Sequence, residues 1–399
     1  MIHGSGLFHP ALIMKRFVIL LLALCLTGCL STPREAFNTH EQRKAELPGF
    51  TDVRVSSEDE NLTAKLERDL IANRQAHPTK QLSILALSGG GADGAFGAGV
   101  LVGWTKKGDR PDFQVVTGVS TGALIAPFAF LGPDYDPQLR EAYTSGIATR
   151  SMKKRPLGAL FTPGVYSSKT FSGLVNHFVD VKLVEDIAAK VDDKGGRLYV
   201  ATTNLDTQSG VIWDLGAIAS QGVAQGEDGK IRARDLIRQV LAASASVPAA
   251  FAPVMIRTEV NENGATSEIN EMHVDGSVTM PFFVLPESLL NWKVPDALKT
   301  NGRIYVLVNG NINPHFAVTK YRALDVAARS FDTLTRAQAR TTLVSIKGFA
   351  ARNGLSVSVV SIPDSFTGGG LMAFDKDSMQ TVFNLGYDLS VDGKGFVRP

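Results

Sequence analysis

The stretch that most constrains the fold is a short apolar run that ends in three consecutive glycines. Residues 85–104 have the sequence LALSGGGADGAFGAGVLVGW, in which the glycines separate a strand-like segment from one with helical spacing. The arrangement recurs at residues 113–122, where an apolar segment ends in GVSTG before another helical stretch. Strands that lead into helices through small-residue turns are typical of crossover units in a mainly parallel sheet. The sequence therefore predicts an α/β fold.

Further segments continue this alternation along the chain. The expected strands are residues 82–87, 113–117, 197–203, 211–215, 254–260 and 303–309, with a turn at Asn263-Gly264. The expected helices are residues 62–74, 95–106, 121–130, 233–245 and 320–347. The chain divides into an N-terminal segment (1–29), a tether with one helix (30–80), a main domain (81–310) and a C-terminal extension of helix and loop (311–399) that is expected to pack on the main domain. The globular part is expected to begin near residue 82, and the residues after 361 are expected to be rich in loops.

Composition narrows the class of protein. The chain has 399 residues, 44% of them hydrophobic, which is enough for a sizeable core. Its 41 basic and 39 acidic residues nearly cancel and form no long run of one sign, so no nucleic-acid partner is expected. Both cysteines, Cys25 and Cys29, lie near the N-terminus, which excludes a disulfide or a cysteine-based metal site in the folded body.

The N-terminal segment resembles a bacterial lipoprotein signal. Residues 14–30 have the sequence MKRFVILLLALCLTGCL, with two cations, then a ten-residue apolar run, then LTGC. Such a run is too short to span a bilayer, which takes roughly 20 residues, and it suits a secretory signal. The resemblance implies that Cys29 is lipidated and becomes the first mature residue; an ordinary cleaved signal is the alternative. We expect a lipid-anchored protein of the cell envelope, at the outer membrane facing the periplasm, because Leu30, directly after Cys29, is not an acidic retention signal.

The pentapeptide GVSTG is typical of a serine nucleophile on a tight turn. Gly118 and Gly122 allow a sharp strand-to-helix turn that exposes the oxygen of Ser120 at a helix N-terminus, where the backbone favours negative charge. The glycine loop lies 29 residues earlier, about one βαβ unit, so both turns are expected at one sheet edge. The backbone amides of Gly90 and Gly91 could then face a carbonyl group attacked by Ser120.

A cofactor loop is the alternative interpretation of the glycines. A dinucleotide site needs an acidic residue at a strand end roughly 20 positions later, whereas Asp109 and Asp112 precede the next strand. A Walker phosphate loop is excluded, because no Gly-Lys-Ser/Thr follows the glycines.

The base that activates Ser120 has two candidates. The order of residues permits a Ser120, Asp275 and His315 triad. A direct pair of Ser120 with Asp275, in the segment HVDGSV, is the other arrangement. His273 lies two positions before Asp275 on the same strand face, and a structural role is favoured for it.

Taken together, these motifs resemble the patatin-like phospholipases. SGGGADG (88–94), GVSTG (118–122) and DGS (275–277) occur in that family's order, and residues 202–216 and 242–254 also resemble its intervening segments. The resemblance covers residues 82–309. It implies a three-layer α/β fold with a mainly parallel central sheet flanked by helices, with residues 81–310 as the catalytic domain.

The resemblance also implies an activity and its residues. Ser120 would be the nucleophile and Asp275 its base, acting on a lipid or phospholipid ester with neither metal nor cofactor. The oxyanion hole would consist of backbone amides from Gly89, Gly90, Gly91, Gly94 and Thr121. Two positions depart from the family: Asp93 stands where Arg or Lys is common, which removes a cation from the loop, and Ser277 stands where most members have Gly or Ala.

Two other functions remain open from the sequence. A soluble short-chain esterase would use His315 in a triad. A catalytically silent envelope protein would keep the fold as a binding surface. The cationic, apolar segment 152–161 is expected to be a solvated loop, with contact to anionic lipid as its alternative.

Overall fold

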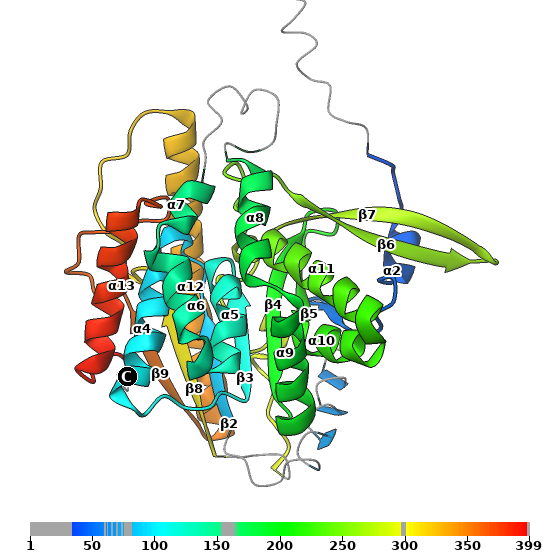
Figure 1. The fold of residues 1–399 in the computed structure, drawn as a ribbon, viewed down its shortest axis with the longest axis horizontal. Coiled ribbons are helices and arrows are strands. Elements are labelled where there is room, and N and C mark those ends of the chain that lie inside the picture. Colours follow the sequence, from blue (N-terminus) through cyan, green and yellow to red (C-terminus); the bar gives the residue numbers. More distant parts are fainter. Residues whose placement is uncertain are drawn as a thin grey trace, which may run out of the picture.

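A layered α/β arrangement, with one sheet between helices, forms the core of the computed structural model (Figure 1). The structure describes residues 34–59, 61, 63–64, 67–68, 71–72, 75, 82–152, 164, 166–296 and 301–396. In the described part, the strand order is β1-β5-β4-β3-β2-β8-β9, and the hairpin of β6 and β7 joins the sheet at β4. The predicted fold class is therefore confirmed.

The strands are β1 (Arg54–Ser56), β2 (Leu82–Leu87), β3 (Val115–Val119), β4 (Arg197–Asn204), β5 (Ser209–Asp214), β6 (Val254–Glu262), β7 (Ala265–Asp275), β8 (Gly302–Val308) and β9 (Leu355–Ser361). The α-helices are α2 (Thr39–Lys44), α4 (Gly94–Lys107), α5 (Thr121–Leu131), α6 (Asp136–Thr144), α7 (Ile147–Ser151), α8 (Ser168–Phe178), α9 (Val181–Lys194), α10 (Leu215–Ala224), α11 (Gly226–Ser244), α12 (Ala323–Asn353) and α13 (Lys376–Val391). None of the helices in these ranges is long and apolar enough to cross a membrane.

The parallel strands have apolar residues on both faces because helices cover both faces. In β2, Leu85 and Leu87 enter the larger core together with α4 and α5, whereas Ile84 and Ala86 enter a smaller core with α12. Alternate residues of a strand point to opposite sides of the sheet, so a strand covered on both sides is a continuous apolar run. For this reason the sequence pattern located both ends of β2, β3, β4 and β8 to within two residues.

The folded part begins earlier than the sequence predicted. β1 pairs antiparallel with β5 at the edge of the sheet, and Leu47, Phe50 and Val53 are buried. The prediction of a start near residue 82 was wrong because these apolar residues are isolated and show no clear periodicity. The described positions between 63 and 75 are helical, as predicted for residues 62–74. The signal segment, with Cys29, lies outside the described residues, as does 153–161 of the cationic segment.

The C-terminal extension is more regular than predicted. β9 adds a parallel strand to β8, and α13 packs along α4, shown in red beside cyan in Figure 1. Their backbones approach so closely that a Cβ atom on Gly99 would lie 2.0 Å from the carbonyl oxygen of Phe383. Residues 362–375 form a loop, as predicted, but α13 was not predicted, because its buried positions are interspersed with polar residues and one of them is Gly386. The extension thus adds one strand to the sheet and one helix beside α4, the helix that follows the glycine loop.

Candidate active site

Ser120 occupies the sharp turn between β3 and α5. Its backbone has φ 56° and ψ −124°, a strained conformation for a residue with a side chain. A Cβ atom on Gly122 would lie 2.5 Å from the carbonyl oxygen of Leu87, and one on Gly118 would lie 2.5 Å from the carbonyl oxygen of Gly122. Only glycine fits these positions, so the GVSTG motif forms the turn that the sequence predicts.

Hydrogen bonds hold Ser120 at both its backbone and its side chain. Its N–H donates to Ser244 Oγ at 3.0 Å, and Ser244 Oγ donates in turn to the carbonyl oxygen of Ala201 at 2.7 Å. The Ser120 hydroxyl donates directly to Asp275 Oδ2 at 2.6 Å, with no histidine between them. Ser244 was not recognised in the sequence, because a serine in a helical segment carries no local sign of this contact.

Asp275 lies at the end of β7, where that strand pairs with β4. Its side chain is fully buried, and its Oδ1 accepts a hydrogen bond from the N–H of Ser277 at 2.8 Å. Burial raises the pKa of Asp275 to about 6, against the opposing effect of the hydrogen bonds from Ser120 and Ser277. A carboxylate with this pKa is a stronger base than an ordinary aspartate and is still ionised at neutral pH.

The glycine loop presents some free amides beside this pair. Within the described ranges, the N–H groups of Gly90, Gly91 and Thr121 have no hydrogen-bond partner. The N–H of Gly89 donates to the carbonyl oxygen of Pro281 at 3.1 Å, and that of Gly94 donates within its own turn. Of the five amides expected in an oxyanion hole, three are therefore free to donate and two are already bonded.

Asn309 secures the glycine loop from the neighbouring strand. It follows β8, and its Nδ2 donates to the carbonyl oxygen of Ser88 at 2.7 Å while its Oδ1 accepts from the N–H of Gly97 at 3.1 Å. Its position at the end of a predicted strand was the only sign of this role in the sequence. The contact holds both ends of the loop that contains Gly90 and Gly91.

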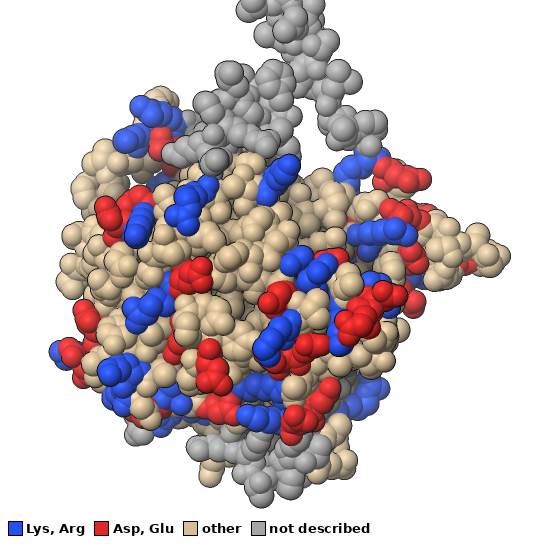
Figure 2. Space-filling model, in the orientation of Figure 1, with Lys and Arg blue, Asp and Glu red and all other residues tan. Residues whose placement is uncertain are grey.

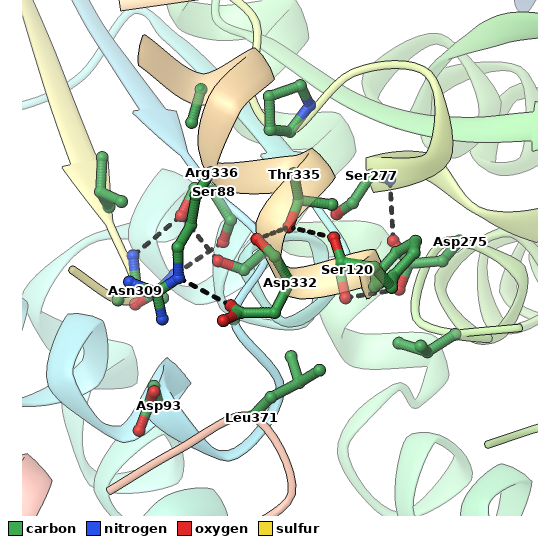
Figure 3. A pocket seen from close by; sticks show the side chains of 18 of the residues that line it. Ser88, Asp93, Ser120, Asp275, Ser277, Asn309, Asp332, Thr335, Arg336 and Leu371 are labelled. Carbon is green, nitrogen blue, oxygen red and sulfur yellow. Dashed lines mark hydrogen bonds and ion pairs between the residues drawn. The ribbon is translucent and has the colours of Figure 1, made fainter. Parts of the chain in front are cut away.

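Two hollows lie near this site. A pocket of about 620 Å³, partly open to solvent, is lined by Ser120 and Asp275 and, from α12, by Asp332, Thr335 and Arg336 (Figure 3). A second chamber of about 660 Å³ is lined in part by Gly91 and Thr121, the sequence neighbours of Gly90 and Ser120 in the first pocket. Its walls are almost entirely apolar and include Leu124, Phe128, Leu174, Val175, Phe178 and Phe374. A polar reaction site thus opens beside a space suited to hydrocarbon.

Comparison with known proteins identifies the family of this chain. The family model described as patatin-like phospholipase matches residues 85–286, just over half of the chain. The chain belongs to the patatin-like phospholipase family. Membership indicates, in general terms, a hydrolase of lipid acyl esters. The family match extends from within β2 to beyond β7, so β8, α12, β9 and α13 lie outside the matched residues.

A solved structure with some similarity is that of VipD from Legionella pneumophila. It has 12% sequence identity and a TM-score of 0.34, over 78% of this chain and 66% of VipD, slightly less than two thirds of that protein's length. No curated protein matches this sequence.

Asp93, the first departure from the family pattern, joins the glycine loop to the C-terminal extension. Its buried carboxylate accepts a hydrogen bond from the N–H of Gly370 at 2.7 Å, and burial raises its pKa to about 6. A cation from α12 lines the cavity. Arg336 lines the cavity, held by Asp332 at 2.8 Å and by the carbonyl oxygen of Asn311 at 2.6 Å (Figure 3). The loop itself has no cation, as the sequence indicates, and the cation that lines the cavity comes from α12.

The histidines do not take part in the Ser120–Asp275 contact. His315 lies on an exposed loop, where it contacts Arg329, and does not line the cavity. His273 is fully buried, and its ring nitrogens contact Thr202 Oγ1 at 2.9 Å and Glu271 Oε2 at 3.1 Å. Burial lowers the pKa of His273, which matches the structural role favoured for it. Among the described residues, no three His, Cys, Asp or Glu side chains gather as a metal site would require.

Proposed function

We propose that the protein is a serine acyl hydrolase that cleaves lipid esters with Ser120 as nucleophile and Asp275 as its base. The observation that carries this proposal is the direct 2.6 Å hydrogen bond from Ser120 Oγ to a buried carboxylate whose pKa is about 6. A serine hydroxyl needs an adjacent base to become a nucleophile, and no histidine competes for that position in this site. The neighbouring free amides support the same chemistry.

The reaction would proceed in two halves. As Ser120 Oγ attacks the ester carbonyl carbon, Asp275 takes its proton, and the negative oxygen accepts hydrogen bonds from the N–H groups of Gly90, Gly91 and Thr121. Collapse of this intermediate breaks the ester bond, and the departing alcohol takes the proton from Asp275. A water molecule then attacks the acyl-serine after giving a proton to Asp275. Release of the carboxylic acid returns that proton to Ser120.

The apolar chamber favours long acyl chains over short ones. It begins at Gly91 and Thr121 and follows α5 past Leu124 to Phe128, a helical rise of about 10 Å. Each methylene group buried there contributes about 0.8 kcal/mol. An acetyl group would leave most of this space unused, so we favour lipid esters over the substrates of a short-chain esterase. A phospholipid or another lipid ester fits this argument equally.

The place of action we propose is the bacterial cell envelope. The lipoprotein-like segment around Cys29 supports attachment of the protein to a membrane, with the outer membrane facing the periplasm as the expected site. There the substrates would be the surrounding lipids.

The proposal is tested by labelling with a fluorophosphonate probe and measuring intact mass. We expect one adduct, mapped to Ser120 and absent from folded Ser120→Ala and Asp275→Asn. Ser277→Ala is the matched control: it removes another serine of the same cavity and should keep the adduct. An adduct that persists in Ser120→Ala would contradict the assignment of the nucleophile. Absence of any adduct in folded wild-type protein would favour a silent binding protein, and loss of labelling in His315→Ala would favour the triad.

A further inference from the structure

A loop before α12 exposes three large apolar side chains to solvent. In the loop formed by residues 313–322, the exposed fraction is 93% for Phe316, 85% for Val318 and 102% for Tyr321. Every residue of this loop is exposed. Single apolar residues are common on protein surfaces, but a group of them at one place marks a contact with an apolar partner.

The loop is anchored at its base and projects beyond it. At the base, Arg329 donates to the carbonyl oxygen of His315 at 2.7 Å, and Asn313 donates to Asp364 at 2.8 Å. Within the described chain, the side chains of residues 316–321 form no hydrogen bond or ion pair that would hold them against the protein. The loop accordingly stands out beside the start of α12, in gold at the upper left of Figure 1. Its apolar side chains are available for insertion.

The charge of the loop identifies the kind of partner. Lys320 and Arg322 adjoin the apolar side chains, and residues 312–324 contain no Asp or Glu. Figure 2 shows basic side chains, with an acidic one among them, at this upper left corner of the molecule. Exposed aromatic and aliphatic groups beside cations suit the boundary of an anionic bilayer, where the apolar groups enter the acyl region and the cations meet the headgroups. A second copy of this chain would present the same positive charge to this loop, so an anionic bilayer suits the loop better.

The loop is also close to the proposed site of hydrolysis. It leads into α12, and Phe331 of that helix lines the cavity that contains Ser120. From Ala323, where α12 begins, to Phe331 the helix rises about 12 Å.

We propose that residues 313–322 dock on an anionic lipid bilayer, with Phe316, Val318 and Tyr321 inserted at the level of the headgroups. This contact is separate from a lipid on Cys29 and does not need Ser120. It would hold the mouth of the cavity at the bilayer surface, where a lipid ester has the shortest path into it.

A tryptophan placed in the loop tests this contact directly in the full chain. Phe316→Trp is mixed with phosphatidylcholine/phosphatidylglycerol vesicles that contain brominated phospholipid, which quenches only tryptophan inserted in the bilayer. We expect quenching of the added fluorescence at least several times that of Val344→Trp, a matched control at a 70% exposed position of α12. Equal quenching at the two positions would overturn the proposal. A blue shift that grows with protein concentration without vesicles would also overturn it, in favour of a second copy.

Two pairs of loop substitutions measure the contributions of the apolar side chains and of the cations to vesicle binding separately. In the background of Phe316→Trp, the pair Val318→Ser and Tyr321→Ser should weaken vesicle binding at least about tenfold, because two apolar side chains no longer leave water. Lys320→Gln with Arg322→Gln should weaken binding only to anionic vesicles and remove its dependence on salt. Turnover of a monomeric soluble ester should not change in any of these variants. Unchanged quenching in both pairs would refute the proposal, whereas failure of hydrolysis alone would refute the proposed function and leave the docking measurement intact.

Discussion

Replacement of Asp275 by asparagine should stabilise the protein while it removes activity. Burial raises the pKa of Asp275 from its ordinary 3.8 to about 6, so the folded protein holds this proton more tightly than the unfolded chain. Stability is therefore lost as the pH rises from 3.8 through 6, when the buried group must ionise. Asparagine has the same shape, can accept from the N–H of Ser277 and can donate to Ser120, but it never carries the charge.

The size of this effect follows from the two pKa values. Their difference, at 1.36 kcal/mol per pH unit, corresponds to about 3 kcal/mol of stability lost at pH 8. We expect Asp275→Asn to raise the free energy of unfolding by up to about 3 kcal/mol at pH 8, and by about half as much at pH 5. Equilibrium urea unfolding at the two pH values measures this. Ester hydrolysis should fall by about 100-fold or more because the base is gone.

Asp93→Asn is the matched comparison for this prediction. Asp93 is also buried with a pKa of about 6, but it bonds Gly370 and not Ser120. The Asp93→Asn variant should show the same pH-dependent gain in the free energy of unfolding, with a smaller loss of activity. A pH-independent effect of Asp275→Asn, or destabilisation at pH 8, would refute the reasoning about its pKa. For the wild-type protein, hydrolysis should decline as the pH falls below about 6, where Asp275 becomes protonated.

Three further substitutions test other parts of the structure. Leu174→Trp should fill the apolar chamber and lower the hydrolysis of palmitate esters by about tenfold, while the hydrolysis of acetate esters stays the same. The control is Asn176→Trp, at an exposed position of the same helix, which should change neither rate. Equal losses on both esters would contradict the role of the chamber. Gly122→Ala should destabilise the protein by at least about 1–3 kcal/mol in urea unfolding, since its Cβ would lie 2.5 Å from a carbonyl oxygen; a change within error would show that the turn can relax. Arg54→Leu should cost about 3–5 kcal/mol at neutral pH because it leaves the buried carboxylate of Glu271 without its 2.6 Å partner, and a neutral result would indicate that the pair contributes little.

Part of the site could be predicted because local sequence determines local geometry. The turn at Ser120 needs glycine on both sides, and this requirement is visible in five consecutive residues. Asp275 directly precedes a glycine in the segment HVDGSV, which is also visible in the sequence, although the strand that ends there, β7, is largely polar. The pairing of these two residues, 155 positions apart, rested on resemblance and on the order of motifs, and the structure places their oxygens 2.6 Å apart.

The tertiary structure alone decided which distant groups complete the site. Arg336 belongs to an amphipathic helix. The spacing of apolar residues in such a helix does not show which face of the sheet it covers or which cavity its cations line. The same holds for Asp93, whose partner Gly370 is 277 residues away, and for the chamber, whose walls come from α5 to α8 and the C-terminal extension.

The difference has a physical origin. By itself the sequence determined the α/β class, most strands of the sheet and the strained serine turn, because strand and helix periods and glycine conformations depend on near neighbours. Packing decided the positions of α12 and α13, the hydrogen bond made by the Gly89 amide and the presence of Arg336 in the wall of the cavity. These depend on which apolar faces meet, and residues hundreds of positions apart become neighbours only when the whole chain has folded.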